Sequence, residues 1–221
     1  WLEGDTIRDL DPGLAPDTRA AVHVADDYRV DNRRLGHAAW AAAAAAGAGV
    51  RLGEAAIRVE STTGPGGARV RGVRLAGGEL LEAGHVVIAA GALSGGIDGL
   101  PRPRPVVPER GQIVAVRMAP QVCGRVVQRG NCYLIPRGSG RLLIGATADR
   151  TGFHAEATAG GVGSLLTAAV DIIPALAEAP ILESWAGLRP ATPDGHPILG
   201  ADPELEGLLY ATGHHRNGIL L

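Results

Sequence analysis

The spacing of hydrophobic positions predicts two helices in this chain. Small and apolar residues recur every three or four positions from 35 to 46, after an Asp31–Asn32 pair that can cap a helix. Glycines at 47 and 49 end this pattern. A second apolar face of helical period runs from 162 to 173, and the proline that follows predicts its end.

Other segments have the alternating or continuous apolar pattern of β-strands. Turn-rich loops at 62–67 and 136–140 separate two pairs of them, which predicts two hairpins. The run 86–90 is apolar throughout and is followed by Gly91, as expected for a parallel strand covered on both faces. The predicted strands are 22–30, 57–59, 70–75, 86–90, 113–116, 126–127, 133–135, 142–144, 181–188 and 208–212.

These elements predict a fold of mixed class, α/β plus α+β. A portion with an open α/β sheet lies at both ends of the sequence, and a mostly antiparallel portion lies between them. The proline-rich stretch 101–105 is expected to connect the two.

Composition is that of an ordinary folded domain and narrows the choice of partners. The 221 residues are 46% hydrophobic and 20% charged, with a formal net charge of −2 and no basic block. We therefore expect neither nucleic acid nor an anionic membrane surface as the main partner. No apolar run is long enough for a membrane span, no signal peptide is visible, and Cys123 and Cys132 form no disulfide framework, so we expect a cytoplasmic protein.

Both ends of the sequence look cut. It begins at Trp1 without a methionine and stops at Leu221, shortly after the stretch 213–218 is expected to open a helix. We therefore expect a piece of a longer protein, truncated at both ends.

Several apparent motifs are better explained by ordinary structure. The glycines from 47 to 53 follow a helix and are spaced one residue too widely for a dinucleotide fingerprint. Ser139 lies in a turn that does not match the GxSxG pattern of a nucleophile, and Cys132 has the surroundings of a buried thiol. His214 and His215 are adjacent and lack a third ligand at a suitable spacing, so we expect no metal site.

Arg189 is the most informative single residue, because its strand is apolar and a buried guanidinium needs an anionic partner. That partner is either an internal acid or a ligand carboxylate held in two-point geometry. An internal acid would count against an enzymatic interpretation. Tyr133 is likewise either a core aromatic or a hydroxyl in a pocket, and the stretch 213–218 is either a simple turn or a binding site for an electron-rich ligand.

Seven segments resemble glycine oxidase, the flavoprotein of thiamine biosynthesis, and the wider family of FAD-dependent amine and D-amino acid oxidases. The resemblance covers nearly the whole chain. The segments that carry it are 26–35, 110–113, 133–137, 140–147, 185–195, 197–200 and 213–221.

The resemblance implies a substrate site and a cofactor site. Arg189 resembles the arginine that binds the substrate carboxylate, Tyr133 the tyrosine that assists it, and Arg216 a second arginine near flavin and substrate. No side chain is expected to act as an acid or base, because the family oxidises the neutral amine and positioning supplies most of the acceleration. The residues expected near FAD are Ala56, Gly91, Gly213, His214, Asn217, Gly218, Ile219 and Leu220.

The activity that the resemblance implies is oxidative deamination of glycine or similar small amines, linked to thiamine biosynthesis. Hydride passes from the substrate Cα to FAD, and oxygen is reduced to hydrogen peroxide. The alternatives are a sarcosine or D-amino acid oxidase or dehydrogenase and, in another class, an incompetent fragment with a structural role or none. A small amino acid and oxygen are the expected partners, and a homo-oligomer is left open.

The resemblance also divides the chain. Residues 1–30 and 100–190 are expected to form the substrate-binding domain, and residues 31–99 and 191–221 an incomplete Rossmann-like FAD-binding domain without the first βαβ unit. His215 stands where the family usually has an aromatic residue, and the GxGxxG fingerprint is missing. We therefore expect these 221 residues alone to bind FAD weakly or not at all and to be inactive.

Overall fold

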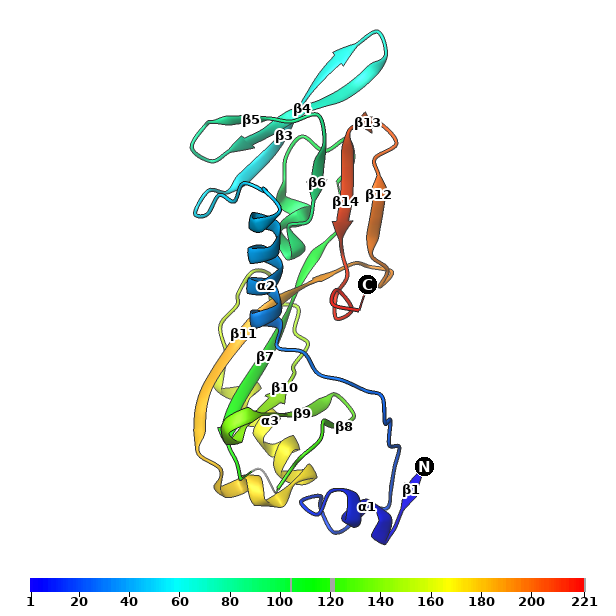
Figure 1. Ribbon diagram of the computed structural model, residues 1–221, viewed down its shortest axis with the longest axis vertical. Coiled ribbons are helices and arrows are strands. Elements are labelled where there is room, and N and C mark those ends of the chain that lie inside the picture. The colour runs from blue at the N-terminus through cyan, green and yellow to red at the C-terminus, as the bar shows by residue number, and fades with distance from the viewer. Residues whose placement is uncertain (104, 120–121, 221) are drawn as a thin grey trace. The chain divides into compact units, whose positions relative to one another are not determined.

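The computed structural model describes residues 1–103, 105–119 and 122–220 (Figure 1). The chain forms two compact units, each assembled from segments far apart in the sequence. The first unit comprises Trp1–Ala43, Arg110–Asp149 and His154–Gly187. The second unit comprises Ala44–Glu109, Arg150–Phe153 and Leu188–Leu221, of which residue 104 and residue 221 lie outside the described part.

A five-stranded sheet in the order β11-β7-β10-β9-β8 forms the framework of the first unit. Its strands β8, β9, β10 and β7 pair antiparallel, and the pairing of β9 with β10 confirms the hairpin predicted from the loop at 136–140. Strands β7 and β11 also contribute residues to the second unit. The strands are β7 (Val107–Arg117), β8 (Val127–Arg129), β9 (Cys132–Arg137), β10 (Arg141–Gly145) and β11 (Ile181–Ala191).

Helix α3 (Ala159–Ile172) packs its apolar face on this sheet. Leu165, Ala169 and Ile172 join side chains such as Leu134 and Ile144 in one buried cluster, as the helical period predicts. The helix ends just before the proline that was expected to stop it. Short 3-10 turns lie at η2 (Gly138–Gly140) and η3 (Pro174–Glu178).

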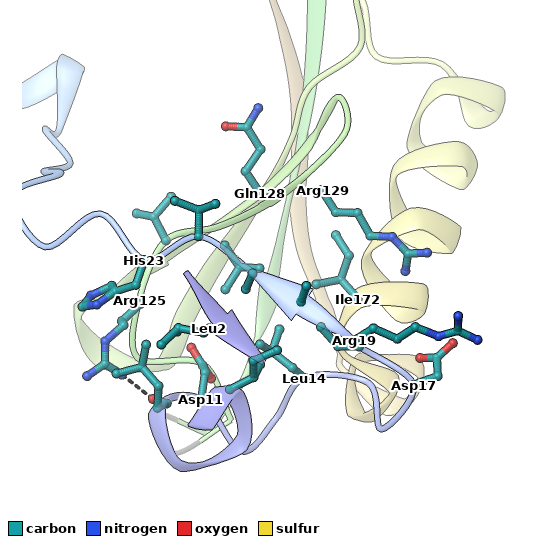
Figure 2. A pocket seen from close by; sticks show the side chains of 18 residues that line it. Leu2, Asp11, Leu14, Asp17, Arg19, His23, Arg125, Gln128, Arg129 and Ile172 are labelled. Carbon is teal, nitrogen blue, oxygen red and sulfur yellow. Dashed lines mark hydrogen bonds between the residues drawn. The ribbon is translucent and has the colours of Figure 1, made fainter. Parts of the chain in front are cut away.

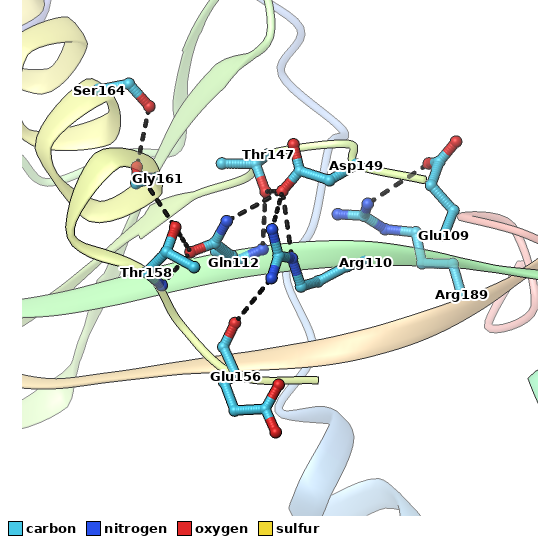
Figure 3. A network of polar contacts seen from close by, with 10 residues as sticks. All are labelled: Glu109, Arg110, Gln112, Thr147, Asp149, Glu156, Thr158, Gly161, Ser164 and Arg189. Atoms are coloured by element: carbon cyan, nitrogen blue, oxygen red, sulfur yellow. Dashed lines mark hydrogen bonds and ion pairs between the residues drawn. The ribbon is translucent and has the colours of Figure 1, made fainter. Parts of the chain in front are cut away.

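A buried polar network fixes the beginning of α3 (Figure 3). Gln112 of β7 is almost fully buried, and its Oε1 accepts a hydrogen bond of 2.7 Å from the backbone N–H of Thr158, the N-cap of the helix. Its Nε2 donates to Asp149 Oδ2 at 2.9 Å, which also accepts from Thr147 and Arg110. The segment 110–113 therefore has a structural task, which is to satisfy the N-terminal donors of the helix.

The N-terminal part of the first unit contains β1 (Leu2–Glu3), α1 (Asp5–Leu10), β2 (Ala20–Ala21) and most of α2 (Asn32–Ala45). Helix α2 lies where the pattern predicts it, and Asp31 Oδ1 accepts the backbone N–H of Arg34 as an N-cap. The strand predicted at 22–30 is wrong. Among the described residues of this region, only β2, at 20–21, pairs with another strand, β1. Val22 and Val24 are exposed, and alternating hydrophobic residues without a partner strand do not form a sheet.

The second unit holds a three-stranded sheet in the order β12-β14-β6 and a sheet in the order β13-β4-β3, with β5 on β4. The hairpin of β3 and β4 confirms the prediction from the loop at 62–67. The strands are β3 (Ala56–Gly64), β4 (Gly67–Leu75), β5 (Leu80–Glu82), β6 (Val86–Ile88), β12 (Ile198–Ala201), β13 (Leu205–Glu206) and β14 (Leu208–Thr212), and η1 (Gly91–Gly96) is a 3-10 helix.

Strands β6 and β14 pair in parallel, with Tyr210 opposite Ile88, which confirms the parallel strand predicted from the apolar run. The prediction that this strand is covered on both faces is wrong in one respect. Val86 and Ile88 are buried in the core of the second unit, but Val87 between them is 56% exposed. Only one face of β6 is therefore packed.

Candidate active site at the carboxyl edge of parallel strands

The second unit has the kind of sheet edge at which α/β proteins bind ligands. Because β6 and β14 are parallel, the segments that follow them leave at the same edge. Thr212, the last residue of β14, donates its hydroxyl to the carbonyl of Gly91 at 3.3 Å and lies 2.7 Å from Ser94 Oγ. The structure therefore brings Gly91 next to the beginning of the stretch 213–220.

The stretch 213–220 forms turns, so the predicted helix is wrong for these residues. Gly213 and His215 have φ angles of 78° and 51°, which an α-helix does not allow. The backbone N–H of Asn217 donates to His214 and that of Leu220 to Asn217, each at 2.9 Å. Three-residue spacing of this kind is typical of successive turns.

Several residues expected near FAD are arranged so that a large ligand can reach their backbone. Gly91 has a φ of 55°, and a Cβ built on it would have open space around it. From Asn217 to Leu220 the stretch is exposed, whereas Gly213 is buried against Thr192. The open space beside Gly91 and the exposure of the stretch from Asn217 to Leu220 leave room at this edge for a large ligand such as FAD. Ala56 is exposed at the start of β3.

Arg189, near the end of β11, has an internal acid beside it. Its Nη1 lies 3.6 Å from Oε1 of Glu109 on β7, and the two side chains are 17% and 13% exposed (Figure 3). The structure thus contains the arrangement that counts against a ligand role for this arginine. The ion pair is loose, however, because 3.6 Å exceeds the length of a good charge-assisted hydrogen bond.

Glu109 is held more tightly by His215 than by Arg189. His215 Nε2 lies 2.6 Å from the same Oε1, and the backbone N–H of His215 donates to the carbonyl of Pro190. Burial raises the pKa of Glu109, but the hydrogen bond to His215 and the charges of His215, Arg189 and Arg216 outweigh it and lower the pKa overall. Glu109 is therefore an ionised carboxylate that interacts with several neighbouring groups. Of these neighbours, Arg216 is exposed to solvent.

Tyr133 belongs to the first unit, where it is half-buried on β9. Its cross-strand partner is Gly145 of β10, and its ring lies so close that a Cβ on Gly145 would come within 2.8 Å of the hydroxyl oxygen. The absence of a side chain at 145 therefore lets the Tyr133 ring lie across β10. Cys132, beside it, is buried as expected, and burial raises the pKa of its thiol.

Sequence reasoning missed Glu109 as the partner of Arg189. The one available signal was the need of Arg189 for an anion, but no periodicity joins two residues that lie 80 positions apart on different strands. His214, adjacent to His215 in the sequence, is partly buried. Ser139 lies in the turn η2, as expected.

A separate cavity of about 430 Å³ lies within the first unit (Figure 2). The N-terminal segment, the end of α3 and β8 with the residues before it line this cavity, and none of the predicted site residues does. Asp11 in its wall is buried, and among the residues that the structure describes neither of its carboxylate oxygens has a hydrogen-bond partner. Burial raises the pKa of Asp11, and Arg125 nearby opposes part of that rise.

In the described part of the chain, no helix combines the length and the apolar character that crossing a membrane requires.

Known proteins similar to this chain include glycine oxidases, a ThiO/ThiG protein and an iminodiacetate oxidase. A bifunctional protein ThiO/ThiG from Trichormus variabilis is 38% identical over the whole chain, which spans 33% of that protein. Glycine oxidase from Geobacillus kaustophilus is 38% identical, and its crystal structure matches the whole chain with a TM-score of 0.89. Iminodiacetate oxidase from Chelativorans sp. is 30% identical in structure-based comparison, with a TM-score of 0.82 over 96% of the chain.

The chain spans 58% of the length of that glycine oxidase and 57% of the iminodiacetate oxidase. The mixed α/β architecture with several sheets matches the fold of these enzymes. The sequence pattern of the FAD dependent oxidoreductase family matches residues 1–221. This chain therefore belongs to the FAD dependent oxidoreductase family, whose members include the glycine oxidases.

Proposed function

We propose that the protein containing this chain oxidises glycine and similar small amines with FAD as cofactor and oxygen as acceptor. The likeness to glycine oxidase along the whole chain is the observation that carries this proposal. The further likeness to a ThiO/ThiG protein supports a link to thiamine biosynthesis. A reducing cytoplasmic location agrees with two buried free cysteines.

In this proposal, residues 31–99 and 191–221 supply the FAD-binding part, with Gly91 and the stretch 213–220 at the carboxyl edge of β6 and β14. Residues 1–30 and 100–190 supply the substrate-binding part. FAD held by the FAD-binding part would supply the redox chemistry, as acceptor of a hydride from the substrate Cα and as the source of the electron pair that, with two protons, reduces oxygen to hydrogen peroxide. The chain itself binds and orients the substrate and needs no strong base.

Arg189 is proposed to bind the substrate carboxylate in competition with Glu109. A guanidinium offers two parallel N–H donors to a carboxylate, and such a bidentate pair is stronger than the loose contact of 3.6 Å with Glu109. Because His215 already holds Glu109 at 2.6 Å, Glu109 has a partner when Arg189 turns to a ligand. Arg216 is proposed to assist Arg189, and Tyr133 keeps its predicted role in binding the substrate.

The test is peroxide production by the full-length protein with glycine, sarcosine and D-alanine. We expect turnover of glycine, and Arg189→Ala is expected to lower kcat/KM by about 30-fold or more, because truncating one partner of a charged contact costs about 2–5 kcal/mol. Arg69→Ala, at an exposed ion pair with Glu206, is the matched control and should change little. An unchanged glycine KM and kcat in Arg189→Ala would show that the carboxylate assignment is wrong.

The other amines separate the alternatives. Faster turnover of sarcosine or D-alanine than of glycine would identify that amine as the preferred substrate. Reduction of a dye without formation of peroxide would indicate a dehydrogenase. No oxidation of any amine by FAD-loaded protein would refute the proposal and leave a structural role.

A further inference from the structure

Several cationic or polar side chains surround the Glu109 carboxylate. Arg189 comes from β11 and Arg216 from the stretch 213–220, and both lower the pKa of Glu109 through their charges. His215 hydrogen-bonds the same carboxylate. Two guanidinium groups and one imidazole therefore surround a single carboxylate. A ligand carboxylate bound at Arg189 places a second negative charge close to Glu109.

We propose that Glu109 is a specificity-determining residue that restricts the site at Arg189 to amines carrying one carboxylate. The inference rests on the proposed function, because it takes Arg189 as the group that binds the substrate carboxylate. It adds to that function a physical reason, the Glu109 charge, for a preference between substrates.

The first argument is like-charge repulsion in a partly buried place. Glu109 Oε1 lies 3.6 Å from the Arg189 guanidinium, so any group bound there comes near an existing negative charge. Both side chains are mostly buried, and screening by solvent is correspondingly weak. A ligand with a second carboxylate therefore brings two negative charges toward Glu109, and juxtaposed like charges are strongly unfavourable.

The second argument is that Glu109 is fixed. The bond of 2.6 Å to His215 holds the carboxylate, and His215 itself is held by its backbone bond to Pro190. Glu109 cannot turn away from an incoming dicarboxylate without losing this bond.

Sarcosine and iminodiacetate form a matched pair of test substrates. Both are N-substituted glycines, with a methyl group in sarcosine and a carboxymethyl group in iminodiacetate, so they differ by one carboxylate. In full-length, FAD-loaded enzyme we expect Glu109→Gln to raise the ratio of kcat/KM for iminodiacetate to that for sarcosine by about tenfold or more. Glu109→Asp keeps the charge and should keep the wild-type ratio.

Glu206→Gln is the control, since Glu206 is a 64% exposed partner of Arg69 on another sheet of the second unit. It should leave the ratio unchanged. An equal ratio in Glu109→Gln and wild type would overturn the inference.

Calorimetric titration with acetate and malonate tests the same point without turnover. We expect Glu109→Gln to strengthen malonate binding relative to acetate by a similar factor, and equal ratios in both proteins would again overturn the inference. If Glu109→Gln does not fold, Arg216→Gln tests the same electrostatic argument by removing a positive charge near Glu109. It removes one positive charge and should shift the ratio toward the monocarboxylate, and a shift toward malonate would contradict the proposal. If no amine is oxidised, the proposed function fails while these titrations still decide the role of Glu109.

Discussion

Arg189 and Asp11 illustrate opposite solutions to the same problem at the scale of a residue. Each carries a charge at a mostly buried position, where an unpaired charge is costly. Arg189 has Glu109 beside it, and Glu109 has His215. Within the described part of the chain the carboxylate oxygens of Asp11 have no hydrogen-bond partner, and burial favours the protonated form of this side chain.

We expect Asp11→Asn to stabilise the protein at neutral pH. Because burial raises the folded-state pKa of Asp11, the stability contributed by its protonated form is complete below the unfolded value of 3.8 and is lost as pH rises through the folded value. The ionised side chain therefore costs stability at pH 7.5, and an uncharged amide of the same shape removes that cost.

Urea unfolding at pH 7.5 and at successively lower pH measures this effect. The difference in unfolding free energy between Asp11→Asn and wild type should shrink as pH falls. Asp17→Asn is the control, because Asp17 lines the same cavity but is exposed. A stabilisation that stays constant with pH would contradict the titration of Asp11 as its cause.

At the scale of elements, the N-terminus of α3 shows how a helix is tied to a sheet. The apolar period predicts the helix, and Thr158 caps it by accepting the backbone N–H of Gly161. The buried Gln112 amide lies over the first turn and occupies the space beside Gly161. This close approach explains a glycine at a position where helix propensity alone disfavours it.

Gly161→Ala is expected to destabilise the first unit by about 1–3 kcal/mol. Its Cβ would lie 2.3 Å from Gln112 Nε2, and moving that buried amide breaks its bonds to Thr158 and Asp149. Gly163→Ala, in the same helix with nothing within 4 Å of its Cβ, should instead stabilise by about 0.5–1 kcal/mol. Thermal and urea unfolding measure the stability of both variants. Equal changes in unfolding free energy in the two variants would show that Gln112 can move aside without loss of stability.

At the scale of the whole molecule, two units are assembled from interleaved segments. Helix α2 belongs to the first unit up to Ala43, whereas the prediction groups residues 31–99 with the FAD-binding part. The assignment of substrate to one part and FAD to the other stays a prediction. The parallel pair β6 and β14 supports it, because that is the only parallel pair of the three-stranded sheet in the described residues.

We expect a polypeptide of these 221 residues alone to bind FAD weakly or not at all. The sequence contains no GxGxxG segment, so the backbone donors and helix N-terminus that usually bind the pyrophosphate are not supplied by it. Titration followed by flavin fluorescence measures the affinity, with the full-length protein as the positive control. Tight, stoichiometric quenching by the 221 residues would contradict this expectation.

Local patterns in the sequence are enough to predict both long helices, the two hairpins, the parallel strand after residue 85 and the mixed fold class. These follow from periodicity and turn chemistry within a few residues. The family is also recognisable from the sequence, through segments spread along the chain. Only the folded chain shows that Glu109 lies beside Arg189 and that Gln112 anchors α3. It also shows that the segment 22–30 has no strand partner among the described residues. Such outcomes depend on which distant segments meet, and a one-dimensional pattern does not encode the partner of a charge.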